Sequence, residues 1–318
     1  MMIVFGPVPS RRLGRSLGIN NIPFKHCSYN CVYCQLGETR YQHLKTADYY
    51  SPKQIFHSVQ EKLQRLIEKN EKIDYLTFVA DGEPTLDRNL GETIELLRGL
   101  KFKIAVISNG SLLGNGLIRK SLSNCDLVSL KIDSGFPAIW KQVNRPVDEL
   151  NWEEFILGLK AFTKNFSGQI ITESMLVKGL NDFEKNLEAI AGFIGELGIT
   201  TAYISAPIRP PVKKWVTLPE ESVLLKAYQI YSRNDKIPRV GLLTNYEGTD
   251  FSFRENVEED FLAIISVHPM RAAAVHDFLK KAHLSWDFID NLLINKKIIR
   301  LSSKNNYYFI RKNMNYGG

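Results

Sequence analysis

The feature that most constrains the fold of this chain is an alternation of apolar and amphipathic segments over the first 210 residues. The apolar segments are short, rich in β-branched residues and nearly continuously apolar, which is typical of strands buried on both faces of a parallel sheet. They cover residues 16–22, 74–80, 103–108, 127–133, 169–177 and 201–207. Helical patterns separate them at residues 52–69, 89–100, 111–122, 149–165 and 181–197. The sequence therefore predicts an α/β fold with right-handed crossovers. Six units are too few for a closed eightfold barrel, so a partial (β/α)6 TIM-like barrel and a doubly wound sheet are the alternatives.

The pattern changes after about residue 235. Residues 236–257 show no clear period, and we expect a linker there. Three short helical patterns follow, and the chain then carries two β-like runs around a polar turn. These five segments cover residues 258–266, 271–282, 285–295, 298–302 and 307–311. Because this is the order of a winged helix, we predict a barrel domain over residues 1–235 and a small winged-helix-like α+β domain over 258–318.

The positive charge is concentrated at the C-terminal end. The whole chain has 41 Lys and Arg against 34 Asp and Glu, a net charge of +7. From Asp260 onward there are nine bases and four acids, which accounts for +5 of that total. This segment is either a solvated basic surface or a binding surface for a polyanion such as RNA. The apolar runs are too short to cross a bilayer and no secretory signal is evident, so we expect a cytoplasmic protein with no membrane partner.

Three of the four cysteines lie within eight residues, and this cluster is the strongest chemical signal in the sequence. Cys27, Cys31 and Cys34 lie in a loop directly after the first predicted strand, whereas Cys125 stands alone. In a reducing compartment, clustered cysteines are more often metal ligands or catalytic groups than disulfides. Structural zinc and iron–sulfur clusters usually take four protein ligands. Three cysteines therefore leave one metal position open for a substrate or cofactor.

The spacing Cys-x3-Cys-x2-Cys, with Tyr33 directly before the last cysteine, resembles the signature of the radical S-adenosylmethionine (SAM) enzymes. The resemblance implies that Cys27, Cys31 and Cys34 hold a [4Fe-4S] cluster and that SAM occupies the fourth iron. It also implies a partial barrel of about six strands as the catalytic domain. The implied reaction is reductive cleavage of SAM to a 5′-deoxyadenosyl radical, which abstracts hydrogen from a substrate. An electron donor such as flavodoxin or ferredoxin would supply the electron.

Further motifs are similar to elements of the same family. The segment DGEPTL at 81–86 resembles its Gly-Glu element, in which Gly82 permits close approach and Glu83 offers a carboxylate to the methionyl ammonium group. A simple turn built on Gly and Pro is the alternative. The resemblance assigns the remaining cofactor contacts to polar residues near strand ends and to the aromatic residue of the signature. These residues are Tyr33, Ser108, Asn109, Asp133 and Ser134; for Ser108 and Asn109 a turn built on Asn and Gly is the alternative.

Basic residues near strand ends predict a positively charged opening to the barrel, which suits a phosphate-bearing substrate. For Arg11 and Arg12 the alternative is a bracing role for the N-terminal segment. Glu173 is a lone acid inside a predicted strand; it is a ligand or proton-transfer candidate if it points into the barrel, and a solvated residue if it points outward. The candidate substrate residues are Arg11, Arg12, Arg145, Glu173, Lys178 and Arg209.

Three segments together resemble a group of radical SAM enzymes allied to the tRNA wyosine synthases. They are residues 4–23, the GEPTL segment and residues 208–211. The chain departs from the wyosine synthases because their second cluster needs three further cysteines and only Cys125 remains. The resemblance favours a base of tRNA or another RNA as the substrate. A peptide or small molecule is the alternative substrate, and an iron–sulfur, redox-sensing regulator that binds nucleic acid is the alternative function.

Overall fold

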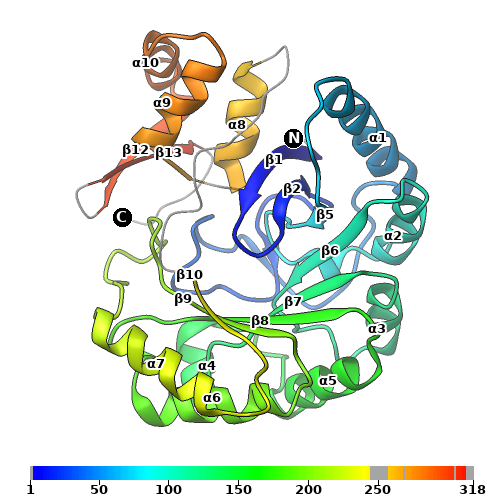
Figure 1. Cartoon of the computed structure of the whole chain (residues 1–318), viewed down its shortest axis with the longest axis vertical. Helices are drawn as coiled ribbons and strands as arrows, with labels where there is room; N and C mark the ends of the chain where they lie inside the picture. The colour runs from blue at the N-terminus through cyan, green and yellow to red at the C-terminus, as the bar shows by residue number, and fades with distance from the viewer. Residues whose placement is uncertain (1–2, 244–256, 268, 304–305, 313–318) are drawn as a thin grey trace.

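The computed structural model describes residues 3–243, 257–267, 269–303 and 306–312. Its main body is an eight-stranded sheet curled into a half-barrel, with helices on the outer face (Figure 1). The strands, in their order across the sheet, are β1 (Val4–Ser10), β2 (Gly14–Ile19), β5 (Tyr75–Phe78), β6 (Lys103–Ser108), β7 (Leu127–Lys131), β8 (Gln169–Met175), β9 (Thr201–Ser205) and β10 (Val240–Leu243). All neighbouring pairs from β2 to β10 are parallel, and β1 pairs antiparallel with β2. The predicted α/β partial barrel is confirmed.

The helices between the strands bury one apolar face against the sheet. They are α1 (Pro52–Glu68), α2 (Leu90–Arg98), α3 (Gly116–Leu122), α4 (Pro137–Val143), α5 (Trp152–Asn165), α6 (Glu184–Gly195) and α7 (Glu221–Arg233). In α1 the Ser51 hydroxyl accepts a hydrogen bond from the Gln54 amide at 3.2 Å, which caps the helix. The buried residues of α1 recur at helical spacing, as Ile55, Val59 and Leu63 show. A smaller apolar cluster around Ala105 and Ile171 packs inside the curve of the sheet.

The six predicted strands are all present, but two further strands were missed. β1 carries Pro7 and Pro9, which do not read as a strand in the sequence and are tolerated because β1 is an edge strand. β10 lies within residues 236–257, where we expected a linker, and extends the sheet by pairing with β9. Residues 236–239 of that expected linker connect α7 to β10, residue 257 begins α8, and residues 244–256 lie outside the described residues. The sheet thus has eight strands where six were predicted.

The chain ends in a small α+β unit with its own core. We call it the C-terminal unit; it comprises α8 (Val257–Val267), β11 (Met270–Arg271), α9 (Ala272–Lys281), α10 (Asp287–Ile294), β12 (Ile298–Ser303) and β13 (Asn306–Arg311). The three predicted helices and the hairpin are confirmed, and β11 adds a third antiparallel strand, beside β13. Phe261, Phe278 and Phe309 belong to its core. The winged-helix assignment stays a prediction.

A buried ion pair and a partly buried hydrogen bond attach the C-terminal unit to the half-barrel. The Lys62 ammonium of α1 lies 3.5 Å from the Asp260 carboxylate of α8, and both side chains are at most 3% exposed. On the other side, the Tyr308 hydroxyl donates a hydrogen bond to the Ile208 carbonyl oxygen at 2.7 Å. The C-terminal unit therefore lies against the barrel rather than apart from it (Figure 1). Within the described ranges, no helix combines the length and apolarity needed to cross a membrane.

Candidate active site

The three clustered cysteines lie at the carboxyl edge of the parallel sheet, in the connection between β2 and α1. Each cysteine sulfur accepts a hydrogen bond from a nitrogen donor of a different residue. The Asn109 amide donates to Cys27 at 3.7 Å, and the Asn144 amide donates to Cys31 at 3.5 Å. The third donor is the Lys25 ammonium, whose nitrogen lies 3.2 Å from the Cys34 sulfur. Donors directed at cysteine sulfurs stabilise thiolate ligands and tune an iron–sulfur cluster that they bind.

The protonation of these cysteines fits a metal-bound role. Although each residue keeps some exposed surface, burial of the thiol raises the pKa of both Cys27 and Cys31 to about 12. They become thiolates when metal replaces the proton. Among the described residues, no three His, Cys, Asp or Glu side chains converge on a position for a single ion. The separation of the three thiols is compatible with an iron–sulfur cluster, because the thiolate ligands of a cluster bind separate irons.

Lys25 supplies a second indication that negative charge belongs at this loop. It is a 2% exposed lysine, and the described residues place no carboxylate oxygen within 4.0 Å of its ammonium group. Burial lowers the pKa of Lys25, but the nearby cysteines, Cys34 first, outweigh that effect and raise it. Three thiolates and the group that they hold would provide the missing anion. The donor set and the buried cation together fit a three-cysteine cluster.

The DGE turn after β5 packs directly on the cysteine loop. A β-carbon at Gly82 would lie 1.8 Å from the carbonyl oxygen of His26, so a side chain at this position requires the backbone to move. The next amide, that of Glu83, donates to the same oxygen at 3.0 Å. Glycine is thus required here because the turn and the residue before Cys27 are in backbone contact.

The Glu83 carboxylate is a buried brace between the ends of β5 and β6. It accepts hydrogen bonds from the Thr85 backbone amide and hydroxyl, from the Ser108 hydroxyl at 2.7 Å and from the Asn109 backbone amide at 2.8 Å. Burial raises its pKa, and these four donors act against that rise. The brace fixes Asn109, whose side chain also bonds the Ser28 hydroxyl at 2.9 Å next to Cys27.

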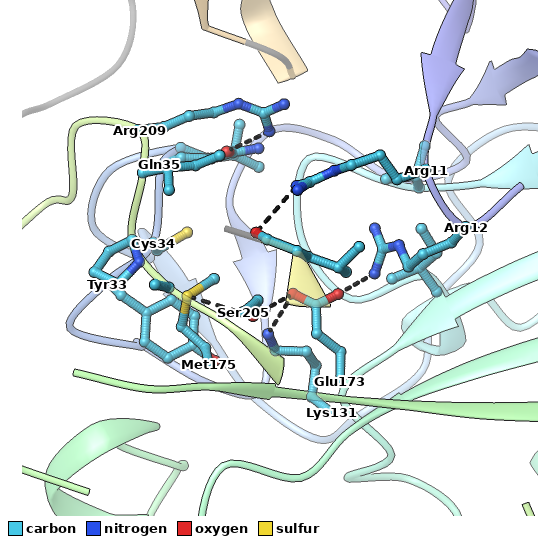
Figure 2. A pocket seen from close by; sticks show the side chains of 17 residues that line it. Arg11, Arg12, Tyr33, Cys34, Gln35, Lys131, Glu173, Met175, Ser205 and Arg209 are labelled. Atoms are coloured by element: carbon cyan, nitrogen blue, oxygen red, sulfur yellow. Dashed lines mark hydrogen bonds and ion pairs between the residues drawn. The ribbon is translucent and has the colours of Figure 1, made fainter. Parts of the chain in front are cut away.

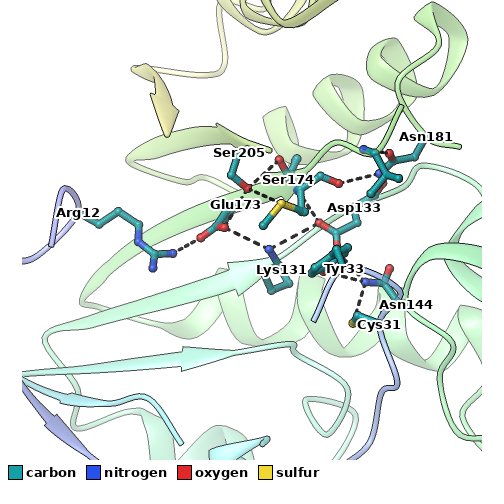
Figure 3. Close-up of polar contacts among 12 residues, drawn as sticks. Arg12, Cys31, Tyr33, Lys131, Asp133, Asn144, Glu173, Ser174, Asn181 and Ser205 are labelled. Carbon is teal, nitrogen blue, oxygen red and sulfur yellow. Dashed lines mark hydrogen bonds and ion pairs between the residues drawn. The ribbon is translucent and has the colours of Figure 1, made fainter. Parts of the chain in front are cut away.

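Asp133, just after β7, links the sheet to the cysteine loop (Figure 3). Its carboxylate accepts hydrogen bonds from the Tyr33 hydroxyl, the Asn144 amide at 2.6 Å and the Met175 backbone amide at 2.7 Å. Because Asn144 also donates to Cys31, this network orients a cysteine of the loop. Ser134 points elsewhere: its hydroxyl bonds the Asn186 side chain of α6 at 3.0 Å.

A cavity of about 290 Å³ opens beside Cys34 and brings together most of the predicted substrate residues (Figure 2). Tyr33, Cys34, Arg11, Arg12, Glu173 and Arg209 all line it. Arg209 donates to the side-chain oxygen of Gln35 at 2.9 Å, next to the last cysteine. Two predicted substrate residues lie elsewhere. Lys178 is exposed and pairs with Glu220, and Arg145 does not line the cavity.

Glu173 points into the half-barrel and is paired with two cations there. It forms an ion pair with Arg12, lies 3.2 Å from the Lys131 ammonium and accepts a hydrogen bond from the Ser205 hydroxyl at 2.9 Å. Burial alone would raise the pKa of Glu173, but Arg12 and Lys131 outweigh it and hold the pKa at about 2. At neutral pH the carboxylate is therefore an ionised anchor for the two cations, and a poor proton acceptor.

Three of the residues that sequence reasoning missed donate to the cysteines or to Glu173. Lys131 could have been found, because it lies two positions before Asp133 and alternation along a strand places both side chains on the same face. Lys25 and Asn144 gave no local signal. Asn144 follows α4 and lies 113 residues from Cys31, so only the tertiary fold brings it to the cysteine loop.

Comparisons with known proteins agree with this geometry. The profile of the family described as the Radical SAM superfamily matches residues 21–193. The UPF0026 protein MJ1312 of Methanocaldococcus jannaschii is 44% identical over 98% of this chain and 96% of its own length. A UPF0026 protein of Helicobacter pylori (strain 26695) is 34% identical over 70% of this chain and 71% of its own.

Two solved structures show the same fold at low sequence identity. The structure of TYW1 with a lysine-pyruvate adduct bound has a TM-score of 0.53 at 16% identity and covers 69% of this chain and 74% of that one. A radical SAM methyltransferase from Sphaerobacter thermophilus has a TM-score of 0.51 at 17% identity, and the match covers 71% of this chain and 66% of that one. From the three-cysteine loop, the half-barrel and the family match, we conclude that this chain belongs to the radical SAM superfamily and is an enzyme that uses a [4Fe-4S] cluster and SAM.

Proposed function

We propose that this enzyme modifies a nucleoside within an RNA, with tRNA as the preferred substrate, and that the reacting nucleoside enters the cavity beside Cys34. The observation that carries the proposal is the charge of that cavity. Its described lining holds four cations, Arg11, Arg12, Lys131 and Arg209, against the single carboxylate of Glu173. Such an excess favours a substrate that carries phosphate. The volume suits one nucleoside-sized group rather than a folded partner.

The position of the C-terminal unit supports the same proposal. Ile208 lines the cavity and accepts the hydrogen bond from Tyr308, so the basic C-terminal unit lies at the cavity rim. On its surface, the Arg300 guanidinium lies 4.8 Å from the ring centre of Tyr307, which is 51% exposed. Aromatic rings and guanidinium planes of this kind stack with unpaired RNA bases.

The residues of this chain divide the proposed task between them. Cys27, Cys31 and Cys34 would hold the cluster, and the Gly82 turn and the Asp133 network would shape the edge on which SAM binds. Once bound, the cluster and SAM supply the family's radical chemistry. Ile107, which packs against the apolar cluster inside the curve of the sheet, adds an apolar side chain to the cavity lining. We also propose that the enzyme is cytoplasmic and takes its electron from flavodoxin or ferredoxin.

The relation to the tRNA wyosine synthases is part of the proposal. The likeness to TYW1 supports the fold, while the charge of the cavity and of the C-terminal unit supports RNA. Cys125 is buried just before the amino end of β7, on the opposite edge of the sheet from the cluster loop. We therefore propose an allied enzyme that lacks a second cluster. Because the chain is a radical SAM enzyme, the alternative of a redox-sensing regulator is set aside.

The test is tRNA binding as a function of salt. Native enzyme is expected to bind unfractionated tRNA with an affinity that falls steeply between about 50 and 200 mM salt. Lys296→Ala combined with Arg300→Ala should weaken binding and reduce the salt slope by roughly one to two. The matched control, Lys53→Ala with Lys164→Ala, removes two exposed cations from α1 and α5 and should leave the slope unchanged.

Absent or salt-insensitive binding would overturn the RNA proposal and favour a peptide or small-molecule substrate. A second measurement looks for the modified nucleoside itself. A tRNA nucleoside profile from cells with and without the enzyme should differ by one modified nucleoside. Identical profiles would count against RNA even if binding is observed.

A further inference from the structure

Lys25 is a buried cation whose ammonium group is directed at the cysteine loop and not at the substrate. It is 2% exposed, its nitrogen lies 3.2 Å from the Cys34 sulfur, and it does not line the cavity beside that cysteine. Its ammonium group is thus placed against the cysteines rather than in the cavity. Its side chain acts on what the cysteines hold.

The backbone at Lys25 is held on both sides in a conformation that lysine disfavours. Its φ of 61° lies in the left-handed region, which non-glycine residues occupy at a cost. Its amide donates to the Asp81 carbonyl at 2.9 Å, and its carbonyl accepts from the Arg40 and Tyr41 amides at 3.2 and 3.1 Å. These bonds require only a main chain, and Gly or Asn would satisfy them with less strain. The backbone at this position therefore does not itself require a lysine.

The charge of Lys25 distinguishes it from the other two sulfur donors. Asn109 and Asn144 are neutral amides at 3.7 and 3.5 Å from Cys27 and Cys31, whereas Lys25 brings a full positive charge to Cys34 at a shorter distance. A fixed cation beside an iron–sulfur cluster stabilises the more negative, reduced form over the oxidised form. Because Lys25 is buried, water and salt screen this interaction weakly.

We propose that Lys25 is a positioning residue that raises the reduction potential of the [4Fe-4S] cluster through its charged hydrogen bond to the Cys34 sulfur. One electron passes from a low-potential donor to the cluster, the donor is oxidised by one electron, and the Lys25 proton stays on its nitrogen. The proposal depends on the cluster that the family uses and is independent of the RNA substrate.

The test is a redox titration of reconstituted holoenzyme without SAM, followed by electron paramagnetic resonance. Lys25→Met keeps an unbranched side chain of similar size and removes the charge and the donor. At a fixed potential, its ratio of reduced to oxidised cluster should fall at least tenfold, which is about 59 mV for a one-electron couple. Lys25→Arg keeps the charge and should retain most of the native midpoint. Lys45→Met, the matched control, removes an exposed lysine near the same loop and should titrate like the native enzyme.

Three results would overturn the proposal. The first is a fully loaded Lys25→Met enzyme with the native midpoint, and the second is an equal shift in Lys25→Arg and Lys25→Met. The third comes from native holoenzyme labelled with 15N at lysine side chains, which keeps the test open if the variants fail to load iron. Electron–nuclear double resonance of the reduced cluster should show a coupled 15N nucleus from Lys25, and its absence would refute the contact with Cys34.

Discussion

Glu173→Gln removes the one carboxylate among the cations of the cavity and is expected to destabilise the half-barrel. Glu173 is 8% exposed as a residue, and its carboxylate pairs with Arg12 and with Lys131. Those cations lower its pKa from 4.5 to about 2 against the effect of burial. At about 1.4 kcal/mol per pKa unit, this difference corresponds to about 3 kcal/mol of stabilisation at neutral pH. Removing one partner from a buried ion pair typically costs about 3–5 kcal/mol, which is similar to the value obtained from the pKa difference.

The loss of stability in Glu173→Gln should also depend on pH, in a direction that the lowered pKa of Glu173 sets. Because the folded chain lowers the pKa of Glu173, its ionised form stabilises the fold fully above about pH 4.5. That stabilisation is lost as the pH falls toward about 2. The gap in unfolding free energy between native protein and Glu173→Gln should therefore be large at pH 7 and should narrow steadily below pH 4.5.

The assay is urea unfolding of native protein, Glu173→Gln, Arg12→Met and the double variant, followed by circular dichroism. The double variant should be less destabilised than the sum of the single variants, because each single change leaves a buried charge without its partner. Glu196→Gln, which breaks an exposed pair with Lys160, should change stability by less than about 0.5 kcal/mol. A Glu173→Gln variant as stable as Glu196→Gln at pH 7, or additive single effects, would refute the reasoning.

Two further predictions concern the surroundings of the cysteine loop, and a third concerns Cys125, which lies away from it. Gly82→Ala places a β-carbon 1.8 Å from the His26 carbonyl oxygen, so iron content after reconstitution should fall clearly below native; a native iron content would contradict that contact. Burial raises the pKa of Asp81 from 3.8 to about 7, so folding stability should decline as the pH rises through that interval. Asp81→Asn has no carboxyl group to ionise, so its stability should not decline over this interval. Urea unfolding should find the variant more stable than native protein by up to about 4 kcal/mol at pH 8, and the difference should vanish near pH 4. Cys125→Ala should cost about 1 kcal/mol and leave iron content unchanged, since this thiol is buried away from the cluster loop; lost iron would show that it participates.

The central strands of this fold could be predicted from sequence because they are buried on both faces and read as continuous apolar runs. The edge strands could not. β1 carries prolines, which remove backbone donors that an edge strand does not need on its open side. β10 is four residues long, pairs with one neighbour and has mixed burial, so neither length nor periodicity marks it. Pairing with the neighbouring strand in the tertiary fold determines where the two edge strands form.

The candidate site divides in the same way. Cys27, Cys31 and Cys34 were visible because short spacing along the chain brings their thiols together. The ion pair of Arg12 with Glu173 joins residues 161 positions apart, so its existence follows from the curl of the sheet. Lys178 shows the converse, because a cation at a strand end can turn to the surface and pair with an exposed acid. Sequence position predicts the edge of the sheet where a residue lies, but not the direction of its side chain.

The central claim is that the three-cysteine loop makes this chain a SAM-cleaving enzyme. It is tested most directly by anaerobic incubation of reconstituted enzyme with SAM and dithionite, with 5′-deoxyadenosine and methionine measured by mass spectrometry. Native enzyme should form both products in equal amounts, and Cys31→Ala should form neither, while Cys125→Ala should behave as native. Native enzyme that carries a full cluster yet releases no 5′-deoxyadenosine, or Cys31→Ala that releases it at the native rate, would contradict the account.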